Sequence, residues 1–588
     1  MNPLGIDESA VAGATKSLIE GFLRSLPAGA VADFTAILAS AAAGSGLHSE
    51  RLRTLEAAFY RDHLALWKST TDSTSESFSI ADGPDPRFSS ADWNELPFFR
   101  YLHQAYLLNC RFVMNLAECG DLAPQARRRL EFVLRQTMDA ASPANSPLTN
   151  PEVIRRSAQS QGESVARGMK LFAADMARGR ITMSDETAFE VGRNLAITPG
   201  AVVLENEVMQ LIQYAPATPQ VFERPLLIVP PFINKYYVLD LQAENSFVRY
   251  CTQQGFATFM VSWRNVPEEL GTLSWQDYVE QGVLAPTQVA QAITGADNIN
   301  TLGFCVGGTL LASALAKMRK GASMPVSSLT LLASLLDFSD VGEISVYIDP
   351  AFVEKAEQEF ANGGIMPGSQ LATTFATLRA NDLIWQFVVN GYLKGQPPRA
   401  FDLLYWNSDG ANLPGRLYAF YLRNMYLENN LRVPDKLSLR GVPIDLGVIG
   451  LPSYVFAAQE DHIVPWRSAY RSMLLLGNES EFVLGASGHI AGVVNPASKN
   501  RRHYWTNPGI VGDPEAWIKT AAQHPGSWWT HWSQWLKTKS GKQIDAPGRL
   551  GNLEYPESEA APGSYVMQRW PTANQGTDTT PFQPRKGS

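Results

Sequence analysis

Two hydrophobic patterns divide the chain near Gly192. Before this residue, apolar side chains recur at three- and four-residue intervals, as over residues 18–38 and 107–116, which is the spacing of amphipathic helices. After it, short apolar runs alternate with helical stretches such as residues 277–293. We therefore predict an all-α N-terminal domain over residues 1–190 and an α/β domain over residues 191–588.

The apolar runs of the second half predict strands that are buried on both faces. Such strands, alternating with helices, are typical of a mostly parallel sheet. Residues 201–204 and 209–214 are joined by a short polar connection and predict a hairpin. The remaining runs lie at residues 225–231, 257–263, 299–304, 328–333 and 453–458.

The alternation stops between Asp337 and about Pro443, where Trp and Tyr residues become frequent. This stretch predicts a helical insertion over residues 338–443 that covers the sheet as a lid. The end of the chain, residues 571–588, is polar with scattered Pro and Gly, and predicts a disordered tail.

Composition excludes several classes of protein. The chain has 588 residues, of which 45% are hydrophobic and 18% charged, which is ordinary for a folded globular protein. No run approaches the ~18 consecutive apolar residues of a membrane-spanning helix. Residues 1–10 lack the features of a secretory signal, and we expect a cytoplasmic protein. The net charge of −8 argues against nucleic-acid binding.

The four cysteines show no disulfide framework and no metal-ligand spacing. No H-x-x-H pattern, dinucleotide fingerprint or phosphate-binding loop occurs either, so we expect neither a metal nor a cofactor. Cys110, Cys119 and Cys251 lie in predicted helices, where a small buried thiol is the better interpretation. Cys305 is the exception.

Cys305 lies in the motif Gly303-Phe-Cys-Val-Gly-Gly, between a predicted strand and a predicted helix over residues 309–317. This is the setting of a nucleophile elbow, in which a sharp turn exposes the nucleophile at the sheet edge of an α/β-hydrolase-like fold. The competing interpretation is a buried structural cysteine beside helix-packing glycines. The elbow requires glycine on both sides, and both glycines are present.

An acid and then a histidine should follow the nucleophile along the chain. Asp461 comes directly after a predicted strand, and His489 lies in a Gly-rich loop after the next one. Both therefore belong to the same sheet edge as Cys305. We expect the backbone N–H groups of Val306 and Ile233 to form the oxyanion hole.

Three further features have mainly structural interpretations. Asn150 is expected to cap a helix that begins at Pro151. The basic run at residues 127–129 predicts a solvated helix face, with an anchoring surface for an anionic partner or particle as the alternative. Trp528, Trp529, Trp532 and Trp535 recur at roughly helical spacing and predict core packing.

Several further stretches of the chain are motifs of one enzyme family. They are Pro230-Pro-Phe-Ile-Asn-Lys-Tyr-Tyr, Val261-Ser-Trp-Arg-Asn, Gly303-Phe-Cys-Val-Gly-Gly-Thr, Phe401-Asp-Leu-Leu-Tyr-Trp-Asn, Glu460-Asp-His-Ile-Val-Pro-Trp and Gly485-Ala-Ser-Gly-His-Ile-Ala-Gly. In these stretches the chain resembles the class I polyhydroxyalkanoate synthases. The resemblance spans residues ~195–535, and one departure is Phe232, where close relatives often carry a cysteine.

The resemblance implies polymerisation of (R)-3-hydroxyacyl-CoA, of short chain length such as 3-hydroxybutyryl-CoA, into a polyester with release of CoA. CoA is then part of the substrate, not a cofactor. The resemblance makes Cys305 the nucleophile that forms a covalent thioester, His489 the base and Asp461 the third partner. It also gives supporting roles to His462, Trp406 and Asp240.

The resemblance further implies a homodimer on cytoplasmic polymer granules, in contact with the growing chain and granule-associated proteins. Two alternatives remain. A Cys-dependent thioesterase or intracellular polyester depolymerase would use the same residues with water as acceptor. A non-catalytic granule-surface protein would keep the fold for binding alone.

Overall fold

A computed structural model describes residues 49–71, 78–80, 83, 85–118, 122–321, 324–477, 480–509 and 512–569. The helical pattern predicted over residues 18–38, Cys119 and the tail at 571–588 lie outside these ranges. The described residues form two compact units. We call them the helical unit, up to Asp185 together with Thr373–Arg399, and the sheet unit, Glu186–Ala372 together with Ala400–Arg569.

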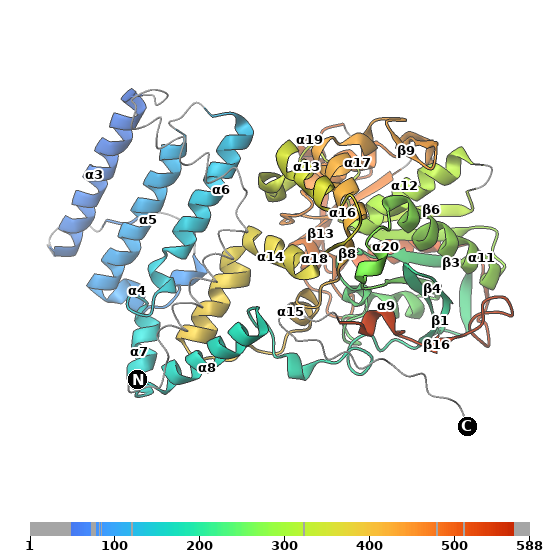
Figure 1. The fold of residues 1–588 in the computed structure, drawn as a ribbon, viewed down its shortest axis with the longest axis horizontal. Helices are drawn as coiled ribbons and strands as arrows, with labels where there is room; N and C mark the ends of the chain where they lie inside the picture. The colour runs from blue at the N-terminus through green and yellow to red at the C-terminus, as the bar shows by residue number, and fades with distance from the viewer. Residues whose placement is uncertain are drawn as a thin grey trace. The chain divides into compact units, whose positions relative to one another are not determined.

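The helical unit consists of amphipathic helices, as predicted (Figure 1). Proline occupies the start of α5, α6 and α7. A backbone N–H at this position has no acceptor within the helix, so the N–H that proline lacks costs no hydrogen bond. Asn150 caps α7 as expected, because its side chain accepts from the N–H groups of Glu152 and Val153. The helices are α3 (Ser49–Thr71), α4 (Asp92–Glu95), α5 (Pro97–Ala117), α6 (Pro124–Ala140), α7 (Pro151–Gln159) and α8 (Glu163–Arg178).

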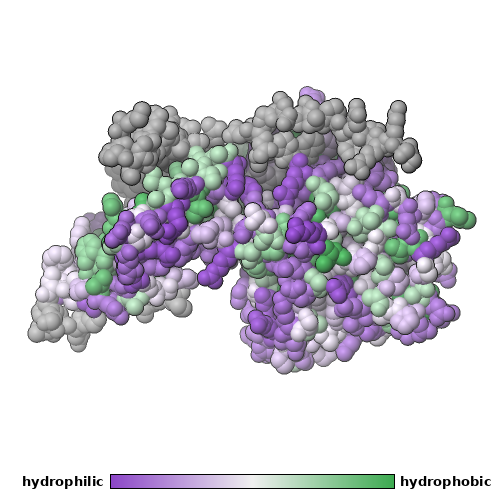
Figure 2. All heavy atoms as spheres, turned by 90° about the horizontal axis from the view of Figure 1, so that it is seen from below, coloured by the Kyte–Doolittle hydropathy of each residue, from purple (hydrophilic) through white to green (hydrophobic). Residues whose placement is uncertain are grey.

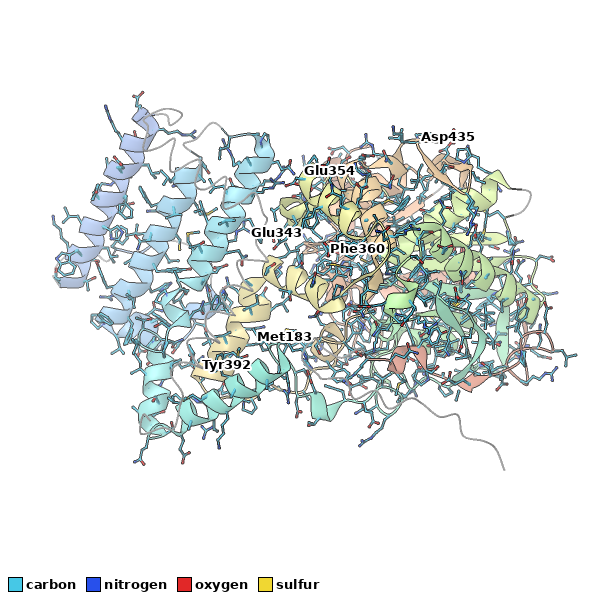
Figure 3. The ribbon with its side chains drawn as sticks, viewed as in Figure 1. Met183, Glu343, Glu354, Phe360, Tyr392 and Asp435 are labelled. Carbon is cyan, nitrogen blue, oxygen red and sulfur yellow. The ribbon has the colours of Figure 1, made fainter. Side chains whose placement is uncertain are left out.

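Residues from the middle of the chain complete the helical unit. Thr373–Arg399 contains the π-helical turns η8 (Asn381–Trp385) and η9 (Val388–Leu393), and η9 packs on α8. The hydroxyl of Tyr392, labelled in Figure 3, donates to Asp175 at 2.7 Å. Lys394 pairs with Glu152 at 2.6 Å. Part of the predicted insertion over residues 338–443 therefore belongs to the helical unit.

The sheet unit contains a twelve-stranded sheet with a parallel centre. Strands β4, β3, β5, β6, β11 and β12 lie side by side and run parallel. The order is β14-β13-β12-β11-β6-β5-β3-β4-β2-β1-β16, with β15 beside β3. This confirms the predicted mostly parallel sheet and the β1–β2 hairpin. The strands are β1 (Gly200–Glu205), β2 (Met209–Tyr214), β3 (Gln220–Val229), β4 (Phe256–Trp263), β5 (Ile299–Phe304), β6 (Val326–Leu332), β11 (Ser453–Ala458), β12 (Ser480–Gly485), β13 (His503–Thr506), β14 (Ala522–Pro525), β15 (Gln543–Asp545) and β16 (Glu559–Ala560).

Helices flank this sheet, and further elements follow β6 before the chain returns to β11 (Figure 1). The flanking helices are α9 (Phe247–Gln253), α10 (Trp275–Val279), α11 (Ala285–Thr294), α12 (Val306–Lys320), α17 (Trp466–Leu474), α18 (His489–Val493), α19 (Pro514–Thr520) and α20 (Trp528–Lys537). Between β6 and β11 lie η7 (Gly342–Tyr347), α13 (Pro350–Glu359), β7 (Ile365–Met366), α14 (Gly368–Leu378), α15 (Asp402–Asn407), β8 (Leu413–Pro414), α16 (Gly415–Tyr421), η10 (Leu422–Leu427), η11 (Asn430–Arg432), β9 (Leu437–Leu439), β10 (Val442–Ile444) and η12 (Leu446–Val448).

The tryptophans of α20 lie in the main core, which confirms their predicted role. Trp528, Trp529 and Trp532 are buried, and Trp535 packs against them. The ring of Trp528 stacks on Phe456 with 4.2 Å between centroids. Aromatic rings of this size bury a large apolar area each, so they stabilise the core beside the sheet.

The described surface mixes hydrophilic and hydrophobic side chains (Figure 2). The basic run of the sequence lies on α6, where Arg128 is exposed and Arg127 and Arg129 are half-buried. Cys110 is half-buried in α5, and Cys251 is fully buried in α9. Within the part of the chain that the structure describes, no helix has the length and hydrophobicity needed to cross a membrane.

Asp240 is a buried carboxyl group next to the sheet and is 1% exposed. One oxygen accepts from the hydroxyls of Thr198 and Ser246, both at 2.6 Å, and the other is buried without a hydrogen-bond partner. Burial raises the pKa of Asp240 to about 6, against these two hydrogen bonds. Burial also raises the pKa of Tyr214 and Tyr236, and the charge of Asp240 adds to both shifts.

This site makes stability depend on pH in a predictable direction. Because the folded-state pKa of Asp240 exceeds its unfolded value, ionisation destabilises the fold as the pH rises from 4 to 7. Asp240→Asn removes the ionisation and keeps an oxygen acceptor. The free energy of unfolding of the variant relative to the parent should therefore increase by on the order of 1–3 kcal/mol over this range. Urea unfolding at both pH values measures it.

Asp297→Asn is the matched control, because it removes a carboxyl group from an exposed position. The prediction is wrong if the parent and Asp240→Asn lose stability in parallel between pH 4 and pH 7.

Candidate active site

Cys305 lies in the sharp turn between β5 and α12. Its backbone has φ 52° and ψ −128°, a strained conformation that residues with a side chain seldom adopt. The N–H of Cys305 donates to the carbonyl of Leu332 at 2.9 Å, and its own carbonyl accepts from Gly308 at 2.9 Å. These two hydrogen bonds hold the turn on both sides of Cys305. The side chain of Cys305 is half-buried.

The glycines of the motif are required by close backbone contacts. A Cβ atom on Gly307 would lie 2.3 Å from the carbonyl oxygen of Val229 at the end of β3. A Cβ atom on Gly303 would lie 2.4 Å from the Cα of Gly308. A side chain at Gly307 would force β3 and α12 apart, and one at Gly303 would force β5 and α12 apart. These two glycines therefore fix the geometry of the elbow.

His489 and Asp461 form a short, buried contact. Nδ1 of His489 lies 2.6 Å from Oδ2 of Asp461, and the side chains are 6% and 0% exposed. The other carboxylate oxygen, Oδ1, accepts from the N–H groups of Ile463 and Val464 at 2.9 and 2.8 Å. These hydrogen bonds hold Asp461 in one orientation. Because Asp461 contacts Nδ1 of His489, the other ring nitrogen, Nε2, can interact with a different group.

Cys305 lies near the His489 ring, since it contributes to the shifted pKa of this histidine and the residue before it, Phe304, stacks on the ring. Burial alone would lower the pKa of His489. The charges of Asp461 and Cys305, with their hydrogen bonds, outweigh burial and raise this pKa well above its usual range. The arrangement therefore favours a proton on His489, next to the sulfur of Cys305. A histidine in this position can accept the proton of a nucleophilic cysteine.

Core side chains hold the histidine in place. Phe304, the residue before Cys305, stacks on the His489 ring with 5.6 Å between centroids. His489 begins the short helix α18, whose carbonyls at Gly492 and Val493 accept from the indoles of Trp528 and Trp529 at 3.0 and 2.9 Å. The tryptophans of α20 thus position α18 in addition to filling the core.

The loop after β3 lies beside the elbow because Val229 touches Gly307. Val306 is the first residue of α12, so its N–H has no acceptor within the helix. The carbonyl of Ile233 accepts from Ala411 at 3.2 Å, which fixes the loop on its other side. Both residues predicted for the oxyanion hole thus belong to adjoining, well-held segments.

Trp406 and Lys235 also hold the loop after β3 in place. The indole of Trp406 donates to the carbonyl of Lys235 at 2.7 Å, and Trp406 is 4% exposed. The ammonium of Lys235 is buried, pairs with Asp409 at 2.9 Å and donates to the carbonyls of Val566 and Gln568. Burial lowers the pKa of Lys235, and Asp409 opposes the shift. Breaking such a buried pair is costly, so the loop is firmly held.

The structure thus brings Cys305, Asp461 and His489 together, with Val306 in the adjoining turn. Trp406 acts on the Ile233 loop through Lys235. His462 is half-buried, and its carbonyl lies against Gly342. Asp240 lies in the buried polar cluster with Thr198 and Ser246, described above.

Two neighbours of Cys305 were missed by the sequence reasoning. Tyr421 and Tyr426, from α16 and η10, have raised pKa values, first because of burial and further because of the charge of Cys305. Thr309, one turn into α12, opposes the shift in the pKa of Tyr421. Their only signal in the sequence is the aromatic content of the insertion, which gives no contacts.

A metal site requires a group of several ligating side chains. Among the residues that the structure describes, no three His, Cys, Asp or Glu side chains are grouped so that they could hold a metal ion. The absence of a bound group is not itself evidence about the reaction. The reactive groups of the site are the thiol of Cys305, the imidazole of His489 and the carboxylate of Asp461.

Two family models match the chain. Residues 84–251 match the N-terminal region of poly-beta-hydroxybutyrate polymerase (PhaC), and residues 224–496 match the alpha/beta hydrolase fold. The second match covers the central strands of the sheet and includes Cys305, Asp461 and His489. It agrees with the mostly parallel sheet and the strand–elbow–helix arrangement described above.

Curated relatives match over most of their length. The poly(3-hydroxyalkanoate) polymerase subunit PhaC of Cupriavidus necator is 46% identical over 90% of this chain and 90% of its own. The protein of the same name from Rhizobium etli is 40% identical over 82% of this chain and 77% of its own. Poly(3-hydroxyalkanoate) polymerase 1 of Ectopseudomonas oleovorans is 39% identical over 83% and 87%. At this identity and coverage, the chain belongs to the poly(3-hydroxyalkanoate) polymerase family.

Proposed function

We propose that this enzyme joins (R)-3-hydroxyacyl groups from CoA thioesters into a polyester and releases CoA, with Cys305 carrying the acyl group. The observation that carries the proposal is the strained elbow at Cys305, with His489 and Asp461 aligned behind it. A histidine-activated cysteine is suited to acyl transfer from a thioester.

Acylation follows from this alignment. The sulfur of Cys305 attacks the thioester carbonyl while His489 holds the thiol proton at Nε2. The N–H groups of Val306 and Ile233 donate hydrogen bonds to the carbonyl oxygen, on which negative charge develops. The carbon–sulfur bond to CoA then breaks, and CoA leaves with the proton. One thioester replaces another, so the acyl group remains activated.

Elongation uses the hydroxyl end of an acyl chain as the acceptor. His489, oriented by Asp461, takes the hydroxyl proton, the oxygen attacks the acyl carbonyl on Cys305, and the carbon–sulfur bond breaks. An oxoester forms, and the proton returns to the sulfur. A thioester is a higher-energy donor than an oxoester, so this step is downhill. Family resemblance also gives Asp461 a part in activating the hydroxyl.

Water competes with the hydroxyl for the same acyl group, and its exclusion separates a polymerase from a thioesterase. Tyr421 is buried and Tyr426 is half-buried, and Cys305 contributes to the raised pKa of both phenols after burial. They support a lid role for their part of the insertion, since they occupy apolar space beside Cys305.

The remaining parts of the proposal rest on family resemblance. We propose short-chain monomers such as (R)-3-hydroxybutyryl-CoA, no cofactor, and a homodimer on cytoplasmic polymer granules with granule-associated proteins. The exposed basic face of α6, at Arg128, is available for an anionic granule component. Size measurement with and without substrate tests the dimer.

Replacing the nucleophile should abolish CoA release. With (R)-3-hydroxybutyryl-CoA, the parent should release CoA and form insoluble polymer, whereas Cys305→Ala should lower the rate at least ~10³-fold. Release is followed with a thiol reagent and polymer by weight. Cys110→Ala, which changes a half-buried cysteine of the helical unit, is the control with parent activity.

Free hydroxy acid without polymer from the parent would instead favour the thioesterase or depolymerase alternative. Release of CoA by Cys305→Ala at the parent rate would contradict the covalent role and favour a non-catalytic granule protein.

Alkylation tests the activation of the thiol separately. Cys305 should react with iodoacetamide faster than the other three cysteines, because His489 accepts its proton. His489→Gln should slow this reaction and lower polymer formation by roughly 10²–10⁴-fold. Mass spectrometry of tryptic peptides measures each site. Equal labelling of all four cysteines in the folded parent would contradict an activated thiolate.

A further inference from the structure

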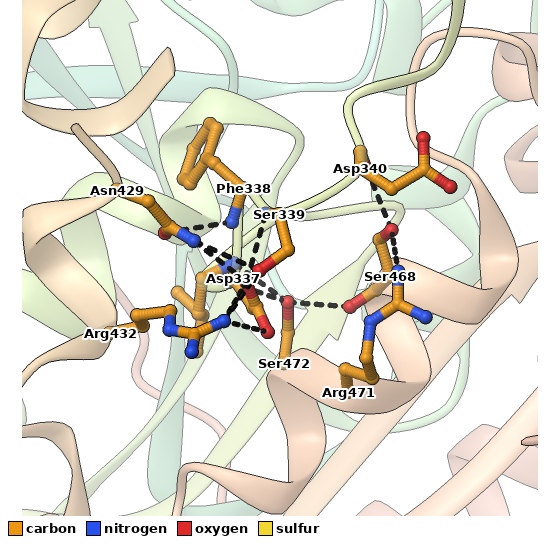
Figure 4. Close-up of polar contacts among 10 residues, drawn as sticks. Asp337, Phe338, Ser339, Asp340, Asn429, Arg432, Ser468, Arg471 and Ser472 are labelled. Atoms are coloured by element: carbon orange, nitrogen blue, oxygen red, sulfur yellow. Dashed lines mark hydrogen bonds and ion pairs between the residues drawn. The ribbon is translucent and has the colours of Figure 1, made fainter. Parts of the chain in front are cut away.

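A polar network closes the base of the insertion between β6 and β11 (Figure 4). Asp337 follows β6, and its Oδ1 accepts from the N–H and hydroxyl of Ser339 and from the amide of Asn429, the last at 2.9 Å. Arg432 contacts both carboxylate oxygens at 3.3 and 3.4 Å. We call Asp337, Ser339, Asn429 and Arg432 the stem clamp.

The stem clamp joins the two ends of a long excursion of the chain. Asp337 and Arg432 are 95 residues apart in sequence. The side chain of Asp337 is only 8% exposed, and the network lowers its pKa even though burial acts in the opposite direction. Ser472 of α17 accepts from the N–H of Asp337 at 2.9 Å and ties the clamp to the sheet unit. A buried carboxylate with this many donors is well ordered.

The clamp is directly connected to aromatic rings beside the nucleophile. Asn429 accepts from the N–H of Phe338 at 2.9 Å and lies three residues after Tyr426. The Phe338 ring meets Tyr426 edge-on at 5.3 Å and Tyr421 at 6.0 Å. We call these three rings the aromatic cover. The chain from Leu332 to Phe338 runs beside the nucleophile turn, because the N–H of Cys305 donates to Leu332 and the hydroxyl of Thr309 donates to Leu335 at 2.7 Å. The cover therefore lies next to that turn, and the raised pKa values of both tyrosines, to which Cys305 contributes after burial, agree with this placement.

We propose that the stem clamp is a positioning element that holds the aromatic cover over the acylated Cys305 and thereby keeps water from the thioester. This inference rests on the proposed function. No member of the clamp acts on the substrate. Arg432 holds Asp337, and Asp337 accepts from Asn429, whose side-chain oxygen in turn accepts from the N–H of Phe338.

The stem clamp thus influences which of two acceptors, water or the hydroxyl of an acyl chain, takes the acyl group from Cys305. When water reaches the site, its oxygen adds to the acyl carbonyl while His489 takes a proton. The carbon–sulfur bond breaks, free hydroxy acid leaves, and the proton returns to the sulfur. A hydroxyl acceptor gives the same bond changes but lengthens the polymer. The ratio of free acid to CoA therefore reports water access, independently of how fast Cys305 is acylated.

Asp337→Asn and Arg432→Met test this proposal. With (R)-3-hydroxybutyryl-CoA, each should raise the molar ratio of free 3-hydroxybutyrate to CoA about five-fold, the factor expected for ~1 kcal/mol of lost discrimination. Arg432→Lys, which keeps the charge without the guanidinium fork, should fall between these variants and the parent. The ratio comes from chromatography of the acid and thiol titration of CoA.

Arg440→Met is the matched control, because Arg440 is similarly exposed and pairs with Asp277 and Glu280, outside the clamp. It should keep the parent ratio. Alkylation of the buried Cys251 reports unfolding in every variant, and if Asp337→Asn or Arg432→Met unfolds, the milder Arg432→Lys decides.

An unchanged ratio in the folded clamp variants, or an equal rise in Arg440→Met, would overturn the proposal. A parent that forms no polymer at all would overturn the proposed function instead, which the same assay shows before any variant is made.

Discussion

The site depends on one close approach between backbones, where the first turn of α12 meets the end of β3 at Gly307. With no side chain between them, the elbow can hold Cys305 in its strained conformation at the carboxyl edge of the parallel strands. That edge also receives Asp461 after β11 and His489 after β12. The order of strands in the sheet therefore converts three distant sequence positions into one constellation.

Sulfur suits this constellation for energetic reasons. A serine ester would hold the acyl group as an oxoester, at the same level as the product, and polymer growth would lose its driving force. A thioester keeps that driving force, but it is also open to hydrolysis. The proposed reaction therefore needs both a reactive sulfur and a dry surrounding, and we assign these two tasks to the buried His489–Asp461 pair and to the rings of Tyr421 and Tyr426.

The features that could be predicted from the sequence are those that a local pattern of residues determines. Buried strands leave apolar runs, and the elbow leaves its glycines, so the central sheet and the positions of Cys305, Asp461 and His489 could be placed in advance. Contacts between residues that are far apart in the sequence produce no local pattern of this kind. The pairing of Asp337 with Arg432, and of Trp406 with Lys235 across 171 residues, follows from how the insertion folds back. Nothing local in the sequence marks Tyr426 as a neighbour of Cys305.

The segment Thr373–Arg399 has a consequence for how relatives can diverge. It lies within the stretch between β6 and β11, yet it packs with α7 and α8 through Lys394 and Tyr392. Gly168 of α8 has no room for a side chain, because a Cβ would lie 1.9 Å from the carbonyl oxygen of Tyr392. Recombination that exchanged only the N-terminal helices would therefore mismatch this surface. The helical unit is inherited intact only when two separate stretches of the gene travel together.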